Sequence, residues 1–308
     1  MGKFELHYYF CDETHSMNAF VRNKCEVEVL AIISEISEIM GVSIQVESEA
    51  LAEGGLRNKW KILGDNSGAI SVVIALSALA VSVYPHIDNE NRNLEKEDLQ
   101  LSIEERKHRL SLLKERIKSG GDFESLASDI LNEDYKVTTR RSNFYKHLNH
   151  YPKVSKVGVI RRDIDDSLLG EERVIERRDF NKFVLKTNKL PPNIDDKAII
   201  EIVSPVLKSG KYQWKGIYNG KVIPFSMSDH AFKASVIHGE MSFQNGTVIK
   251  CVLEEALKLD EIGDIKSTGY TVTTVISKDD NGEWLETKQG INYEYSKKQR
   301  NNQGELFE

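Results

Sequence analysis

Between Asp65 and Asp88 the chain carries no Asp, Glu, Lys or Arg. Most of this stretch, Ser67–Tyr84, consists of Ser, Gly, Ala, Val, Ile and Leu with a single Tyr. As a helix it would extend about 27 Å, and the hydrocarbon core of a bilayer is about 30 Å thick. Because so long an apolar run must be removed from water, the fold has to bury this helix in protein or in a membrane.

Small, weakly polar residues follow one face of this predicted helix. Three interpretations of the helix stay open. It is a buried helix of a globular domain, a membrane helix that packs through small residues, or a pore-lining helix of an oligomer. Trp60 before the run and Tyr84 at its end suit interfacial anchors of a membrane helix. The face predicted to line a pore or to pack on other helices consists of Ser67, Ser71, Ala75, Ala78 and Ser82.

The rest of the chain predicts an α+β fold in two parts. Residues 1–120 form an oligomerising domain of mixed α/β character, with the apolar membrane-type helix 67–84 and a charged helix over 89–119. Residues 121–308 form a β-rich ligand-binding domain in which Asn-Gly dipeptides mark turns. The expected strands of this part are Lys153–Ile160, Phe183–Lys186, Lys197–Val203, Lys221–Phe225, Phe232–His238, Val248–Leu253 and Thr271–Ile276, and Glu254–Asp264 is an expected short helix.

Enzyme signatures are absent from the 308 residues. No phosphate-binding Gly-rich loop, nucleophile elbow or zinc-protease motif occurs, so we expect no enzymatic activity, no cofactor and no metal. The three cysteines are too scattered for a disulfide framework and indicate a reducing compartment. One metal alternative remains, since His7, Cys11 and His15 are spaced by four, but a structural zinc ion requires four ligands. A phosphodiesterase that uses scattered acidic residues is a further alternative.

Two windows lack acidic residues although the whole chain has a net charge of −6. The first, Tyr135–Arg162, contains eight Lys and Arg residues among Tyr, Phe and His. The second, Ile202–Ser228, contains four Lys residues with Tyr, Trp and Phe among them. Lysine and arginine neutralise phosphates, and aromatic rings stack on unpaired bases, so both windows favour single-stranded nucleic acid. The competing interpretation is a basic surface that balances acidic neighbours, with the aromatic residues in the core.

The candidate nucleic-acid-binding residues come from both windows. They are Arg140, Arg141, Phe144, Tyr145, Lys146, Tyr151, Lys153, Lys211, Tyr212, Trp214 and Lys215.

The order of these features resembles the membrane effector of the Hailong antiphage defence system. The resemblance rests on the segments His15–Phe20, Asn23–Glu26, Glu47–Ala50, Glu53–Leu56 and Trp60-Lys61, followed by the apolar helix and the basic, aromatic β domain. It implies an ion-channel domain joined to a crown domain that binds a single-stranded DNA oligomer. It also implies a partner nucleotidyltransferase that makes this DNA, and growth arrest when the channel opens.

On this basis we expect an antiviral defence effector that forms a homo-oligomeric channel in the bacterial inner membrane. A short single-stranded DNA holds the channel closed, and the ligand domain lies on the cytoplasmic side. The alternative is a soluble oligomeric nucleic-acid-binding or scaffold protein without channel activity.

Overall fold

The computed structural model describes residues 1–12, 16–49, 56–84, 103–119, 122–280 and 282–304. Two compact units are present: Met1–Asn188 with Leu259–Asp264, and Lys189–Lys258 with Ile265–Glu308. The chain is mixed α/β with a β-rich C-terminal part, which confirms the expected class at that level. The domain boundary lies after Asn188 instead of residue 120, because residues 123–183 complete the layers of the first unit.

The first unit is built on an antiparallel sheet with the strand order β2-β3-β1-β4-β5. β3 shows why one face of the sheet is apolar: buried and half-buried residues alternate along it, as a strand with one covered face requires. The strands are β1 (Gly2–Phe10), β2 (Gln45–Ser48), β3 (Leu56–Leu63), β4 (Val154–Arg162) and β5 (Arg173–Glu176).

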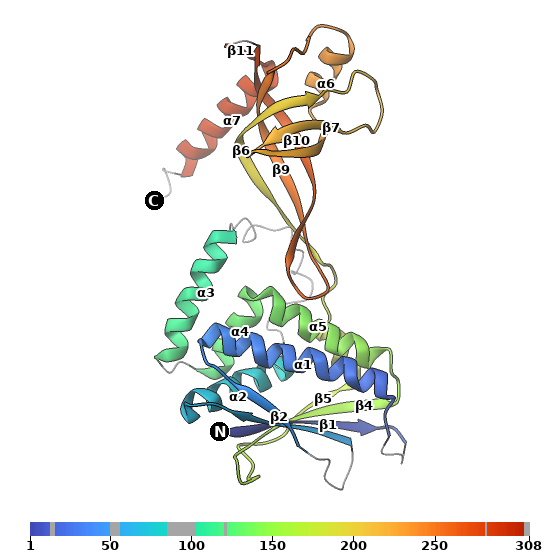
Figure 1. Cartoon of the computed structure of the whole chain (residues 1–308), viewed down its shortest axis with the longest axis vertical. Coiled ribbons are helices and arrows are strands. Elements are labelled where there is room, and N and C mark those ends of the chain that lie inside the picture. The colour runs from blue at the N-terminus through green and yellow to red at the C-terminus, as the bar shows by residue number, and fades with distance from the viewer. Residues whose placement is uncertain (13–15, 50–55, 85–102, 120–121, 281, 305–308) are drawn as a thin grey trace. The chain divides into compact units, whose positions relative to one another are not determined.

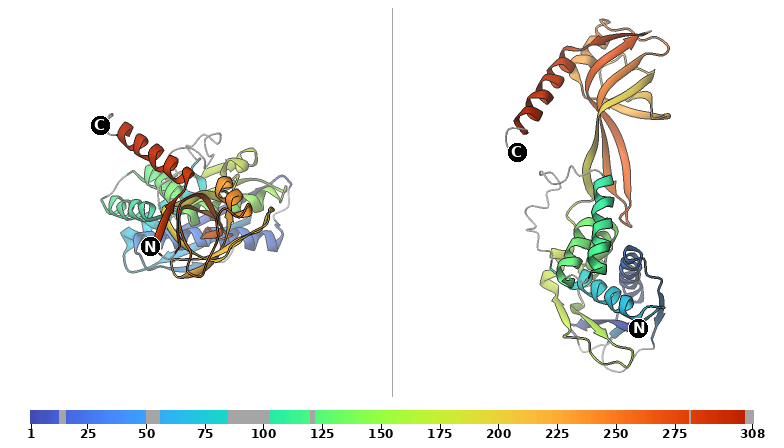
Figure 2. Two further views of the ribbon diagram at one scale, coloured as in Figure 1. Left: turned by 90° about the horizontal axis from the view of Figure 1, so that it is seen from above. Right: turned by 90° about the vertical axis from the view of Figure 1, so that its left-hand side faces the viewer.

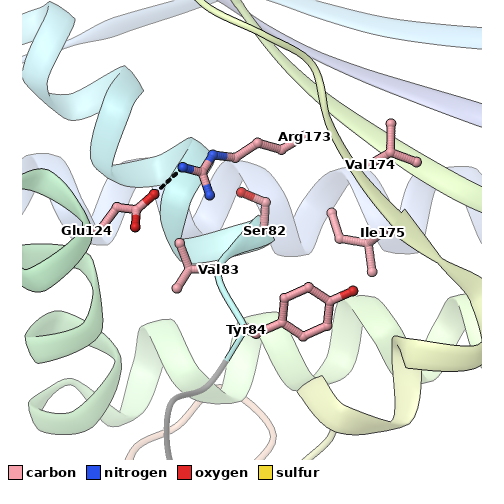
Figure 3. A pocket seen from close by; sticks show the side chains of 7 residues that line it. All are labelled: Ser82, Val83, Tyr84, Glu124, Arg173, Val174 and Ile175. Carbon is pink, nitrogen blue, oxygen red and sulfur yellow. Dashed lines mark hydrogen bonds and ion pairs between the residues drawn. The ribbon is translucent and has the colours of Figure 1, made fainter.

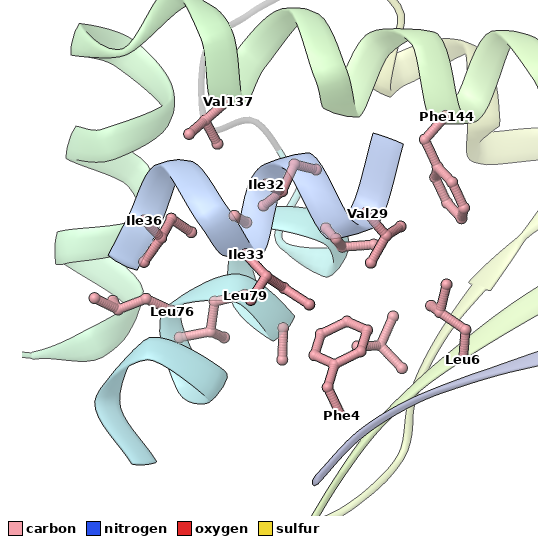
Figure 4. Packing of buried hydrophobic residues seen from close by; sticks show 14 of the residues in the cluster. Phe4, Leu6, Val29, Ile32, Ile33, Ile36, Leu76, Leu79, Val137 and Phe144 are labelled. Atoms are coloured by element: carbon pink, nitrogen blue, oxygen red, sulfur yellow. The ribbon is translucent and has the colours of Figure 1, made fainter. Parts of the chain in front are cut away.

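Helices cover that face of the sheet and lie on one side of it in both side views (Figures 1 and 2). Phe4 and Leu6 of β1 meet Val29 and Ile33 of α1 in the core between the layers (Figure 4). The helices of this unit are α1 (Ala19–Met40), α2 (Ser67–Ser82), α3 (Ile103–Lys118), α4 (Phe123–Glu133) and α5 (Tyr135–Asn149).

The apolar run forms α2, and α2 is a buried helix of this unit. It packs against α1, α4 and the sheet. Ala75, Ala78 and Ser82 of the expected pore-facing stripe are at most 4 % exposed. Ser67 and Ser71, in the first two turns of α2, are exposed. The membrane-type helix predicted for this run is therefore wrong, since protein covers its apolar surface. Among the described residues, none of the helices has both the length and the apolar character needed to cross a membrane.

The end of α5 is held by one arginine side chain. Arg177 lies in the 3-10 helix η1 (Arg177–Phe183). It donates to four carbonyl oxygens, those of Leu148, Tyr151 and Val154 from Nη1 and that of Asn149 from Nη2, at 2.8–3.2 Å. Helix ends leave carbonyl groups without intrahelical partners, and a cation there also complements the helix dipole.

We predict that Arg177→Ala lowers the free energy of unfolding by about 2–3 kcal/mol, because hydrogen bonds from a charged donor are lost and carbonyls remain unpaired. Urea unfolding at pH 7 measures the change. The matched control is Arg178→Ala, whose side chain is 84 % exposed and whose ion pair with Asp179 is long, at 3.8 Å. We expect a change within about 0.5 kcal/mol for this control. Equal effects of the two substitutions would contradict the assigned role of Arg177.

The second unit is a five-stranded barrel. Its sheet order β11-β10-β8-β7-β6-β9 is closed by pairing of β10 with β9. β10 runs parallel to β8, and helix α6 (His230–Ile237) connects β8 to β9. The barrel strands are β6 (Lys189–Ser204), β7 (Trp214–Tyr218), β8 (Lys221–Met227), β9 (Val248–Leu259) and β10 (Ile265–Asp280), and β11 (Glu283–Glu286) and α7 (Lys288–Gly304) follow. This topology, with the helix between the third and fourth strands, is that of the OB-fold.

Three local predictions in the C-terminal part are wrong. The expected strand Phe232–His238 is occupied by α6, and Phe183–Lys186 is not a strand. The expected helix Glu254–Asp264 is the end of β9 and the turn that follows. Asp260 organises this turn by accepting hydrogen bonds from the backbone N–H groups of Ile262 and Asp264. A local polar side chain thus replaces the helix hydrogen bonds.

Candidate nucleic-acid interface

The outer face of β7 and β8 is the candidate interface, and barrel packing determines which residues reach it. Trp214 and Gly216 point inward, where a Cβ on Gly216 would lie 2.4 Å from Ile200 Cγ2. Lys215 lies between them and is exposed. It is opposite Pro224 of β8, and Ile217 is opposite Val222 in the next row. In the OB-fold, the face of the second and third strands binds oligonucleotides or oligosaccharides.

The β6–β7 loop borders this face and holds an exposed aromatic ring. Tyr212 is 59 % exposed. Its ring lies over Gly210, where a Cβ would come within 2.8 Å of Tyr212 Cε2 and where φ is +138°. Lys233 of α6 donates to the carbonyl oxygen of Gly210 at 3.0 Å. The loop therefore presents Tyr212 from an anchored backbone.

Exposed lysines lie in the same loop and along β7 and β8. Lys208, Lys211, Lys215 and Lys221 are all exposed, and none forms an ion pair with a described residue. Exposed apolar side chains lie on β8 and on the neighbouring β6, among them Val222 at 63 % and Val203 at 53 %. The second window thus provides cations, apolar contacts and one free aromatic face. Trp214 is the exception, since it is fully buried against Phe225, Phe232 and Phe243, so its predicted contact with nucleic acid is wrong.

The aromatic residues of the first window belong to the core of the first unit. Phe144 and Tyr145 on α5 are fully buried, and Arg141 is 1 % exposed. Tyr145 donates to the Val81 carbonyl oxygen at 2.9 Å, and Arg141 donates to that of Val83 at 3.4 Å. Bases cannot stack on covered rings and a buried guanidinium cannot reach a phosphate, so these three predicted contacts are wrong. The buried side chains instead hold the end of α2.

Several cations of the first window are neutralised by acidic residues far along the chain. Arg140 pairs with Glu28 at 3.2 Å, and Arg162 pairs with Glu5 at 2.7 Å. Lys153 pairs with Asp12 at 3.4 Å. Tyr151 is half-buried, and its hydroxyl accepts a hydrogen bond from the Asn18 backbone N–H. Only Lys146 among the candidate cations of this window is exposed without an ion pair to a described residue.

Burial dominates the titration of Glu28. It raises the pKa of this carboxyl above its ordinary value of 4.5, although the hydrogen bond and charge of Arg140 act in the opposite direction. A carboxyl whose pKa is raised by folding binds its proton more tightly in the folded state. Stability that depends on this proton is therefore present below pH 4.5 and is lost as pH rises through the folded pKa.

We predict that Glu28→Gln removes this pH dependence. The free energy of unfolding of the wild type minus that of the variant should fall as pH rises above 4.5, and become constant at higher pH. Urea unfolding between about pH 4 and 8 measures the difference. Glu38→Gln is the control on the same helix, because Glu38 is exposed. A difference that increases with pH would mean that attraction to Arg140 outweighs burial.

A small open pocket lies in the first unit at the end of α2 (Figure 3). Its volume is about 330 Å³. Val83, Val174 and Ile175 provide apolar walls, Tyr84 lies at one side, and Arg173 and Glu124 form an ion pair across it. The Tyr84 hydroxyl donates to Asp179 at 3.0 Å, and its ring packs on Phe183. The sequence gives no local signal for this pocket, because its walls come from three separate segments.

The zinc alternative receives no support from the described residues, which contain no group of three potential ligands. His15 lies outside these residues. Comparison of the chain with protein-family models, with curated proteins and with solved structures finds no match in any of the three.

Proposed function

We propose that the C-terminal barrel binds single-stranded nucleic acid on the outer face of β7 and β8 and the β6–β7 loop. One observation carries the proposal: the unpaired lysines of the second window lie on the strands, and in the loop, that bind ligands in the OB-fold. Lysines that are not neutralised internally are available to phosphates. Exposed Tyr212 offers a face on which a base can stack.

The proposed ligand is a short single-stranded DNA. This choice rests on the resemblance to the Hailong effector, in which a partner nucleotidyltransferase supplies the oligomer. The barrel would then be the sensing part of an antiphage effector. Membrane conductance and location at the inner membrane are not part of the proposal, since α2 is buried in the first unit.

We predict that replacing Lys211, Lys215 and Lys221 with Gln weakens binding mainly through lost phosphate contacts. Each lost contact should reduce the slope of log K against log salt by about 0.7. The triple variant should therefore lose about two units of slope. Fluorescence anisotropy with a labelled single-stranded DNA at several salt concentrations measures it. Lys298→Gln on α7 is the control, because Lys298 is exposed but lies outside the interface. An unchanged slope in the triple variant contradicts the proposed interface.

Tyr212→Ala tests the stacking contribution separately. We expect the affinity for single-stranded DNA to fall by a factor of about 5–150, which corresponds to about 1–3 kcal/mol per stacked base, with little change in salt dependence. Tyr295→Ala on α7 removes an equally exposed ring, at 64 %, and should have no effect. If neither the lysine variant nor Tyr212→Ala changes DNA binding, the exposed apolar side chains point to a protein partner instead.

A further inference from the structure

The pocket at the end of α2 has an exposed apolar rim. Tyr84 is 43 % exposed and Val174 is 40 % exposed, and Phe123, next to the lining residue Glu124, is also 40 % exposed. A volume of about 330 Å³ is at the lower limit for small-molecule sites, which reach about 1,000 Å³. An open hollow of this size suits one inserted side chain better than an enclosed ligand. Glu176, two residues after Val174, is exposed and forms no ion pair with a described residue.

The same unit carries a protruding apolar stripe on α1. Phe20 is 79 % exposed, more than any other large apolar side chain described, and Val27 is 57 % exposed. Phe20, Lys24 and Val27 are spaced i, i+4 and i+7, so they share one face of the helix. Such spacing is typical of helices that insert anchor residues into a groove.

The stripe is held in place before any partner binds. Asn18 caps α1 by accepting hydrogen bonds from the backbone N–H groups of Phe20 and Val21 at 2.9 and 3.3 Å. The Asn18 N–H donates to the Tyr151 hydroxyl at 3.2 Å. A side chain on a fixed helix end loses less conformational entropy on binding than one on a mobile loop.

We infer that the α1 stripe of one copy docks into the α2-end pocket of a second copy, with Phe20 inserted and Lys24 facing Glu176. Size and charge support a second copy as the occupant. An aromatic ring fits the hollow, and Lys24, which forms no ion pair with a described residue, is opposite in sign to the unpaired Glu176. Both surfaces belong to one unit, so every copy presents the anchor and the pocket. A protruding apolar group and a pocket on the same molecule generate assemblies through repeated contacts.

Exchanging the charges of Lys24 and Glu176 provides the sharpest test. The full-length protein is first treated with nuclease, so that bound nucleic acid cannot bridge two copies. Sedimentation velocity over a concentration series measures self-association. We expect Phe20→Ala and Val174→Lys each to weaken association at least tenfold. Lys24→Glu and Glu176→Lys alone should each weaken it about two- to fivefold, and the double variant should regain the wild-type value.

Mixing adds a positive test. Phe20→Ala protein retains the pocket and Val174→Lys protein retains the anchor, so a mixture should form dimers that neither variant forms alone. Ile291→Lys on α7 is the control and should associate like the wild type, because Ile291 is 53 % exposed but lies outside both surfaces and outside the barrel interface. A wild type that stays monomeric at about 100 μM, or self-association that neither Phe20→Ala nor Val174→Lys alters, would overturn the inference. DNA binding by the barrel is measured separately and is independent of this result.

Discussion

Burial of α2 is the constraint on which the first unit depends. Side chains such as Ile70, Val73, Leu76 and Val81 are fully buried, and each contributes about 1.5–3 kcal/mol relative to exposure. The sheet alone cannot cover a helix that is apolar on all sides. Coverage also requires α1 and α4, while α5 supplies Tyr145 and Arg141 for the carbonyl groups at the helix end. This requirement explains why the chain up to Asn188 belongs to one unit with the apolar run.

Ion pairing separates two windows that both lack acidic residues and both combine cations with aromatic residues. In the first, the acidic partners of the cations come from distant segments: Glu28 is 112 residues from Arg140, and Glu5 is 157 residues from Arg162. In the second, the lysines have no such partner among the described residues. A local count of charges cannot distinguish a neutralised cation from a free one. The interpretation of basic residues that balance acidic neighbours therefore fits the paired cations of the first window, whereas none of the second window's lysines has an acidic partner among the described residues.

Periodic and turn-forming segments could be predicted from the sequence, and segments defined by distant contacts could not. The helix over 67–84 and the turn at Asn219-Gly220, where both residues have positive φ, follow from local preference. α5 was missed because its buried side chains include Arg141, Thr138 and Tyr145, which have no apolar periodicity. The end of β9 was mistaken for a helix because Glu254–Leu259 mixes Glu, Lys and Leu. This segment is a strand because it pairs with β6.

The β9–β10 turn belongs to the first unit, and this limits which parts of the barrel could contact the proposed ligand. In OB-folds this turn and the loop between the first two strands border the bound ligand. Here Leu259–Asp264 belongs to the first unit, where the Asn143 side chain donates to the Glu261 carbonyl oxygen at 2.9 Å. Gly263 lies so close to Lys136 that a Cβ would approach its Cα to 2.6 Å. In the proposed function, recognition would then depend on the β6–β7 loop and the outer face, where lysines and apolar side chains dominate. Such a surface favours phosphates and stacking over base-edge hydrogen bonds, so binding would be salt-dependent and tolerant of sequence.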